Sequence, residues 1–156
     1  ELRLTVEAQL PDGMRILRRT LIGHSFGGLF TVNAVLTQPY AFDDFIAADP
    51  SFWWDQRRLI QKAAADGLGD KAAAGPGRRL YLGFATKPRK DRTGSADRPA
   101  AGARLSADPL VSDFIGKLQS QGLQVRRQDF PDEVHGTVMF PALFDALKHF
   151  YTRELS

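Results

Sequence analysis

One serine in this chain has the setting of a catalytic nucleophile. The segment Gly23-His24-Ser25-Phe26-Gly27-Gly28 matches the pattern G-x-S-x-G, in which the serine occupies a tight turn between a strand and a helix. Glycines beside the serine would avoid backbone clashes in such a turn. We therefore predict that Ser25 is a nucleophile for acyl transfer. The alternative is a glycine-rich turn that holds a structural serine.

The residues around this motif supply the strand and the helix that it needs. The apolar run Arg19–Gly23 predicts a buried strand, and the apolar and small residues of Phe26–Leu36 predict a helix. The positive end of that helix would point toward an oxyanion that develops at the serine. We expect the backbone N–H of Phe26 to be one oxyanion donor.

A histidine late in the chain is the candidate base. His135 lies in Pro131–Gly136, between the last predicted strand and the last predicted helix. Loops that follow parallel strands meet at one edge of the sheet, so His135 could reach Ser25. It would take the serine proton and later donate it to the leaving alcohol. The alternative is a solvated loop histidine. His24 is expected to pack beside the nucleophile as a supporting residue.

The third catalytic residue is expected between the serine and the histidine, just after the strand Arg79–Ala85. The first carboxylate there is Asp91, which is our candidate. Asp97 and Asp108 come later in the chain. Asp97, an acid elsewhere, or no effective third residue remain alternatives. Asp91 could also simply balance the charges of its basic neighbours.

Two groups of side chains are candidates for substrate binding. Trp53 and Trp54 follow the predicted strand Phe45–Ala48, and we expect one of them to contact a flat acyl group while the other could be core. Asp55 is expected to cap the next helix. Lys87 and Arg89, with Lys90 and Arg92, could attract an anionic ligand, or could belong to a solvated loop.

The order of elements predicts an α/β fold with a mainly parallel sheet and helices on both faces, in a single domain over residues 1–156. Further helices are expected over Gln56–Ala65, Asp108–Gln121 and Thr137–Tyr151, with a strand over Gln124–Phe130. Glu1–Ala8 is expected to be the end of a helix, and Thr86–Ser106 a long loop.

Composition excludes several classes of function. The 156 residues contain no cysteine, which excludes disulfides and thiolate chemistry, and the three histidines are too scattered to predict a metal site. The net charge of +3 is too small to indicate nucleic acid as a partner. No apolar stretch of about eighteen residues predicts a membrane span.

Three sequence blocks together resemble the esterase D-type family of α/β-hydrolases, and most closely its enterobactin and salmochelin esterases. The blocks are Gly23–Phe30, Asp49–Asp55 and His135–Pro141. The resemblance implies a three-layer α/β-hydrolase fold, with Ser25 as nucleophile and His135 as base. It also implies that this chain is the C-terminal half of the fold. The first strands and the loop with the second oxyanion donor are then expected upstream of Glu1.

The resemblance implies hydrolysis of a small-molecule ester, such as an anionic ferric siderophore built as a tri-catechol lactone. No cofactor and no metal ligands are expected, because any iron would belong to the substrate. The family commonly carries a glutamate after the third strand, where this chain has Thr86–Lys90. A carboxylesterase for another acyl ester, or an impaired hydrolase-like binding domain, are the competing hypotheses.

Overall fold

The computed structural model describes residues 5, 7–69, 77–90, 97–98 and 100–152. The strands are β1 (Thr20–His24), β2 (Asp44–Ala48), β3 (Arg79–Ala85), β4 (Arg89–Lys90), β5 (Asp97–Arg98) and β6 (Gln124–Phe130). The helices are α2 (Phe26–Thr37), the 3-10 helix η1 (Trp54–Arg57), α3 (Arg58–Asp66), α4 (Ala101–Ser106), α5 (Pro109–Ser120) and α6 (Met139–Tyr151).

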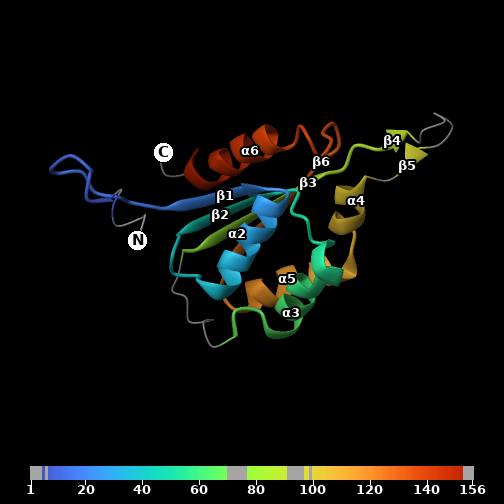
Figure 1. The fold of residues 1–156 in the computed structure, drawn as a ribbon, viewed down its shortest axis with the longest axis horizontal. Helices are drawn as coiled ribbons and strands as arrows, with labels where there is room; N and C mark the ends of the chain where they lie inside the picture. The colour runs from blue at the N-terminus through green and yellow to red at the C-terminus, as the bar shows by residue number, and fades with distance from the viewer. Residues whose placement is uncertain (1–4, 6, 70–76, 91–96, 99, 153–156) are drawn as a thin grey trace.

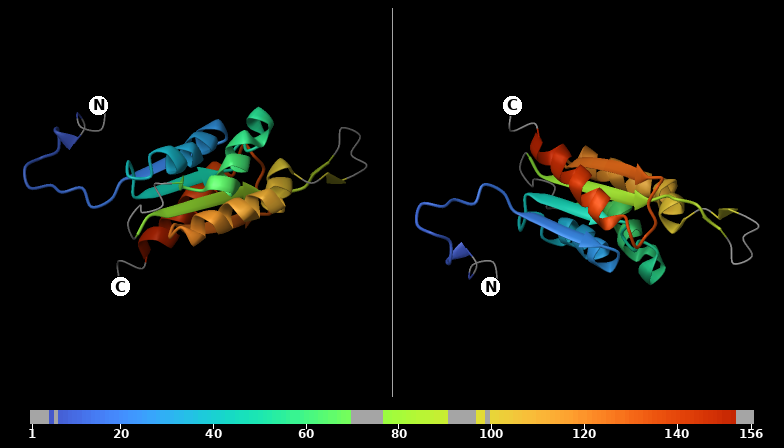
Figure 2. Two further views of the ribbon diagram at one scale, coloured as in Figure 1. Left: turned by 90° about the horizontal axis from the view of Figure 1, so that it is seen from below. Right: turned by 90° about the horizontal axis from the view of Figure 1, so that it is seen from above.

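Four parallel strands form the central sheet in the order β1-β2-β3-β6. The apolar runs of β2 and β3 are continuous, as expected for strands that are covered on both faces, whereas the edge strand β6 is more polar and alternates in burial. Every residue of β2 is buried. Helices α2, α3 and α5 cover one face and α6 covers the other, so the described elements form three layers (Figures 1 and 2). The predicted α/β class and the parallel sheet are confirmed.

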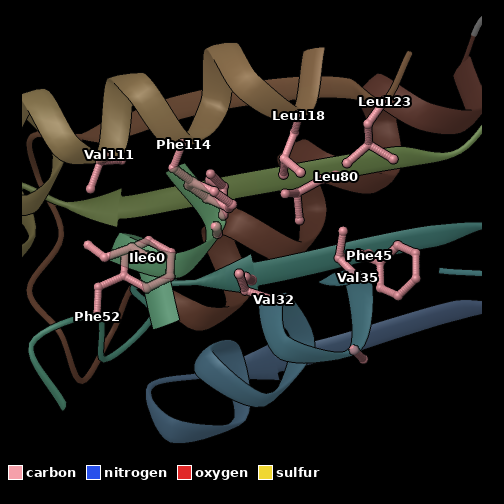
Figure 3. Packing of buried hydrophobic residues seen from close by; sticks show 14 of the residues in the cluster. Val32, Val35, Phe45, Phe52, Ile60, Leu80, Val111, Phe114, Leu118 and Leu123 are labelled. Carbon is pink, nitrogen blue, oxygen red and sulfur yellow. The ribbon is translucent and has the colours of Figure 1, made fainter. Parts of the chain in front are cut away.

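The larger hydrophobic core lies between the sheet and helices α2, α3 and α5 (Figure 3). Its fully buried residues include Val32, Val35, Phe45, Ile60, Leu80, Leu82, Val111, Phe114 and Leu118. Phe52, which follows β2, also lies in this core and contacts Phe114 edge-on at 5.9 Å between ring centroids. The start of the Phe52-Trp53-Trp54 segment is therefore fixed by packing.

A smaller core lies under α6 on the opposite face. Ala142, Ala146 and Phe150 of α6 pack against Ile46 and Tyr81 of the sheet. The hydroxyl of Tyr81 donates a hydrogen bond of 2.6 Å to Asp145. Burial and this bond raise the pKa of Tyr81 well above its ordinary value. Helix α6 is thus attached to the sheet by both apolar and polar contacts.

A buried network of ion pairs and hydrogen bonds connects the amino ends of the strands. Asp44 is fully buried, and its carboxylate accepts hydrogen bonds from Arg18, Arg79 and Tyr151 at 2.6 to 3.0 Å. Burial alone would raise the pKa of Asp44, but these donors outweigh it and lower the pKa to about 2. The network links the segment before β1 to β2, β3 and the end of α6.

One prediction of local structure is wrong, and another lies largely outside the described residues. Thr86–Ser106 is not one loop, because it contains β4, β5 and the helix α4. Helix α4 packs on β3, and a Cβ atom at Gly102 would lie 2.3 Å from the carbonyl oxygen of Ala85. Glycine is therefore what permits this contact. The helix predicted over Glu1–Ala8 falls largely outside the described residues, although Thr5 and Glu7 are helical.

The turn between β2 and α3 also differs from expectation. Asp55 does not cap a helix: it lies within η1, and α3 begins only at Arg58. Asp55, Gln56 and Arg57 have positive φ angles of 45°, 52° and 68°. Three successive non-glycine residues in this conformation cost roughly 1–2 kcal/mol each. Arg57 is held there by a hydrogen bond of 2.5 Å to Asp108.

Candidate active site

Ser25 occupies a strained turn at the carboxyl end of β1. Its φ and ψ angles are 58° and −118°, which is unusual for a residue with a side chain. Its N–H donates a hydrogen bond of 3.0 Å to the carbonyl of Ala48. A Cβ atom on Gly23 would lie 2.0 Å from the carbonyl oxygen of Gly27, so the turn requires glycine at position 23. Strain of this kind is characteristic of functional sites.

Helix α2 begins directly after this serine. The N–H of Phe26 therefore belongs to the first turn, whose donors have no partners within the helix. The partial positive charge of the helix start lies beside the Ser25 hydroxyl. The role of Phe26 as an oxyanion donor stays a prediction, since no oxyanion is present.

His135 reaches Ser25 across the sheet edge. It lies in the loop between β6 and α6, and its Nε2 is 3.0 Å from Ser25 Oγ. The carbonyl of His135 accepts a hydrogen bond of 2.7 Å from His24 Nε2, and the two rings lie 4.6 Å apart. His24 thus contacts the His135 loop from the nucleophile strand, which fits the supporting role expected from the sequence.

The other ring nitrogen of His135 contacts a carboxylate that sequence reasoning missed. His135 Nδ1 lies 2.6 Å from Asp49 Oδ2. Since a carboxylate accepts, Nδ1 carries the hydrogen, and Nε2 is left to accept from the Ser25 hydroxyl. The side chain of Asp49 is 5% exposed and that of His135 is 51% exposed. A buried acid, an accessible histidine and a serine thus form one continuous hydrogen-bonded chain.

Asp49 is held in place by its own backbone and by β3. Its φ is +42°, its N–H donates a hydrogen bond of 2.7 Å to Gly83, and its Oδ1 accepts one of 3.2 Å from the N–H of Ala85. A Cβ atom at Gly102 would lie 2.5 Å from the same Oδ1. Contacts with β3 and α4 therefore determine the position of this carboxylate.

The acids expected to complete the site do not occupy this position among the described residues. Asp91 lies outside the described part of the chain, and so does the side chain of Asp97. Asp108 caps α5 by accepting a hydrogen bond of 2.9 Å from Leu110, and its hydrogen bond with Arg57 lowers its pKa. Asp49 could have been found from the sequence, because it directly follows β2, the strand beside the nucleophile strand.

A second serine lies against the first. Ser51 is buried, and its Oγ is 3.2 Å from Ser25 Oγ. Its N–H donates a hydrogen bond of 3.1 Å to the carbonyl of Ser25. The Asp49-Pro50-Ser51 segment therefore contributes both the carboxylate on His135 and a contact to the serine turn.

The two tryptophans predicted to bind substrate are both on the surface beside the serine. Trp53 is 55% exposed and Trp54 is 52% exposed, so neither is core. Both rings contact Phe26 edge-on, at centroid distances of 5.6 Å and 5.1 Å. Whether either contacts substrate stays a prediction.

Of the two basic residues predicted to bind substrate, the structure describes the side chain of Lys87 but not that of Arg89. Lys87 is exposed and shares a small hollow of about 50 Å³ with Asp49 and His135. Arg89 begins β4, but its side chain lies outside the described part of the chain. Within the described ranges, no group of three or more histidines and acids could hold a metal ion. No helix in those ranges is long and apolar enough for a bilayer.

Comparison with known proteins connects this geometry to characterised hydrolases. The chain is 33% identical over 135 residues to the siderophore enterobactin esterase of Emericella nidulans, which covers 81% of this chain and 45% of that protein. The siderophore hydrolase EstB from Aspergillus nidulans superimposes with a TM-score of 0.64 at 27% identity, covering 96% of this chain and 53% of that one.

A bacterial structure is similar to the same extent. The IroE-like serine hydrolase from Shewanella oneidensis superimposes with a TM-score of 0.62 at 26% identity, over 96% of this chain and 44% of that one. No protein-family model matches the chain. The chain thus spans about half the length of the relatives that it matches.

Proposed function

Because this chain belongs to the siderophore-esterase family of α/β-hydrolases, we propose that the protein is a serine esterase that hydrolyses the ester bonds of a siderophore. The observation that carries the proposal is the continuous chain of hydrogen bonds from Asp49 through His135 to Ser25. These residue types in this order can generate a serine nucleophile without any other group.

In the proposed first step, Ser25 Oγ attacks the ester carbonyl while its proton passes to His135 Nε2. The carboxylate of Asp49 stabilises the resulting imidazolium and keeps the ring oriented. The N–H of Phe26, at the start of α2, is placed to donate to the oxyanion of the tetrahedral intermediate. The alcohol then leaves with the proton from His135 Nε2, and an acyl-serine remains.

In the second step, water attacks the acyl-serine. His135 Nε2 takes a proton from this water, and a second tetrahedral intermediate forms. Its collapse returns the proton to Ser25 Oγ and releases the carboxylic acid. The 51% exposure of the His135 side chain supports this step, because water can reach the imidazole. Asp49 replaces the Asp91 of our sequence-based hypothesis as the proposed acid.

The substrate class comes from the relatives. Curated relatives are named for esters of enterobactin, triacetylfusarinine C and ferri-bacillibactin, which are all siderophores. The half-exposed rings of Trp53 and Trp54 beside Ser25 fit a bulky, flat-sided substrate. The proposed substrate is therefore a siderophore ester, with any iron supplied by the substrate.

The test compares a tri-catechol lactone, with and without iron, against p-nitrophenyl butyrate. In the Ser25→Ala variant we expect kcat/KM to fall by about 10⁴-fold or more, because the nucleophile is gone. Ser120→Ala is the matched control, since it removes a serine hydroxyl from the exposed end of α5. Ser25-dependent turnover of the simple ester alone would indicate another acyl ester. No Ser25-dependent turnover of either would indicate a ligand-binding domain.

A further inference from the structure

An open groove lies between α2 and α3. It has a volume of about 430 Å³, within the range of small-molecule sites. Phe26, the residue after Ser25, lines the groove together with Phe30 and Trp54. All three rings are at least 50% exposed. Clusters of exposed aromatic side chains are typical of binding surfaces, whereas single exposed apolar residues are common anywhere on a protein.

The charges that line this groove have one predominant sign. Arg58 and Lys62 contribute two cations, and Asp55 contributes one carboxylate. Asp55 lies 3.8 Å from Arg58, and both side chains are well exposed, so this pair is weak and leaves the groove positively charged. The lining thus combines the aromatic side chains of α2 and η1 with the cations of α3.

A strained turn joins the aromatic and cationic parts of the lining. Asp55, Gln56 and Arg57 have positive φ angles; Trp54 before them contacts Phe26 edge-on, and α3 begins after them at Arg58. The hydrogen bond from Arg57 to Asp108 attaches the turn to α5. Strained backbone persists where its surroundings enforce it, and it concentrates at ligand sites.

We propose that the α2–α3 groove binds a planar aromatic arm of the acyl group, one that carries anionic or electron-rich ring oxygens, while the ester carbonyl lies at Ser25. Phe26, Phe30 and Trp54 contact the ring, and Arg58 and Lys62 attract its oxygens. This inference rests on the proposed function for its ester carbonyl. It assigns the charge selectivity to α3 rather than to Lys87 and Arg89.

Binding can be tested without any turnover. The two tryptophans of the chain are Trp53 and Trp54, so 5-fluorotryptophan labelling gives two ¹⁹F resonances, which Trp53→Phe and Trp54→Phe variants assign. The Ser25→Ala protein is titrated with 2,3-dihydroxybenzoate, with benzamide as an uncharged ring and with cyclohexanecarboxylate as an anion without a ring. We expect a saturable shift of the Trp54 resonance, strongest with 2,3-dihydroxybenzoate.

A pair of charge variants makes the test specific. Arg58→Gln/Lys62→Gln should weaken binding of 2,3-dihydroxybenzoate by about fivefold to tenfold, and less at high salt. Arg15→Gln/Lys148→Gln removes the same charge from exposed positions away from the groove and should change binding less than about twofold. The inference is overturned by the absence of a saturable Trp54 shift, or by equal weakening in both double variants.

A kinetic comparison separates this inference from the proposed function. The methyl esters of N-(2,3-dihydroxybenzoyl)serine and N-acetylserine share one ester bond and differ only in the aromatic arm. Arg58→Gln/Lys62→Gln should lower kcat/KM about fivefold for the aromatic ester and leave the acetyl ester nearly unchanged. An equal loss on both esters contradicts the groove assignment. Absence of turnover of both by the unmodified protein contradicts the proposed function, while the NMR titration still decides the groove.

Discussion

The polar groups at the two ends of the central sheet differ in burial, in pairing and in backbone conformation. At the amino ends of the strands, Asp44 is fully buried and paired with two arginines and a tyrosine. At the carboxyl ends, Ser25 and Asp49 have positive φ angles, and the side chain of His135 is half exposed. The same four strands thus carry a buried, fully hydrogen-bonded carboxylate at one end. At the other end they carry residues with strained backbone and an accessible histidine.

This difference separates stability from reactivity. A buried carboxylate with all its partners stabilises the fold but offers no site for chemistry, whereas strained and accessible groups can meet a substrate. We therefore expect substitutions at the carboxyl end to change activity with little loss of stability. Substitutions at the amino end should do the reverse.

Among the variants that test this contrast between the two ends of the sheet, the largest effect is expected at Asp49. Asn fits the same space and can still accept from the N–H of Ala85, but its NH₂ group would face His135 Nδ1. That places the ring proton on Nε2, which can then no longer accept from Ser25. We expect kcat to fall by about 10³–10⁴-fold with an unchanged midpoint of urea unfolding. Asp91→Asn is the matched comparison: if it, and not Asp49→Asn, abolishes turnover, the proposed acid is wrong.

The next largest effect is expected at the opposite end of the sheet. Asp44→Asn leaves the guanidinium groups of Arg18 and Arg79 without their carboxylate, and should lower the free energy of unfolding by about 3–5 kcal/mol. Turnover per folded molecule should stay the same. Urea unfolding with Asp113→Asn as the control measures the loss. If Asp44→Asn does not fold, Tyr151→Phe removes one donor to Asp44 and should cost about 1 kcal/mol.

Acid should weaken the amino end of the sheet within a defined pH range. The pKa of Asp44 is about 2 in the folded protein against an ordinary value of 3.8. A lowered pKa stabilises the protein fully above about pH 4, and that contribution disappears as the pH falls through 2. We expect a loss of about 2 kcal/mol across this range. Asp44→Asn should lack this component of the acid unfolding curve, and an unchanged curve would show that Asp44 does not contribute.

The smallest effect is expected within the nucleophile turn itself. Gly27 is exposed in α2, and apart from its chain neighbours and the nearby backbone of α2 no described atom lies within 4 Å of where its Cβ would be. Gly27→Ala should therefore raise the free energy of unfolding by about 0.5–1 kcal/mol, through helix propensity. Gly23→Ala is the contrasting variant, since its Cβ would clash with the helix backbone and prevent the turn from forming. Equal behaviour of the two would contradict the steric account.

These contrasts also explain how far the sequence could predict the molecule. β1, β2 and β3 were found because short apolar runs have a local signature, and β6 was found because its side chains alternate. Ser25 was found because its turn requires glycine at position 23. Asp49 was missed because the search followed chain order past the third strand. The acid instead directly follows β2, which lies between β1 and β3 in the sheet.

Other differences arose where tertiary contacts override local preference. Helix α4 is short and rich in small residues, and it depends on the close approach of Gly102 to β3. The left-handed turn at Asp55, Gln56 and Arg57 contains no glycine, so the local sequence does not predict its positive φ angles. Its anchor is Asp108, about fifty residues away along the chain. A contact between residues so far apart in the chain cannot be predicted from a short window of sequence.

The register of the sheet determines the separation between Ser25 and Asp49. His24 is paired with Ala48, and Ala48 with Gly83, so Ser25 and Asp49 each stand one step beyond a paired position. Their separation therefore follows the spacing of neighbouring strands, which is nearly constant in proteins. Loops that contact substrate can change in length and composition while the distance between nucleophile and acid is preserved. New specificities can then arise on this framework without the reacting groups being rebuilt.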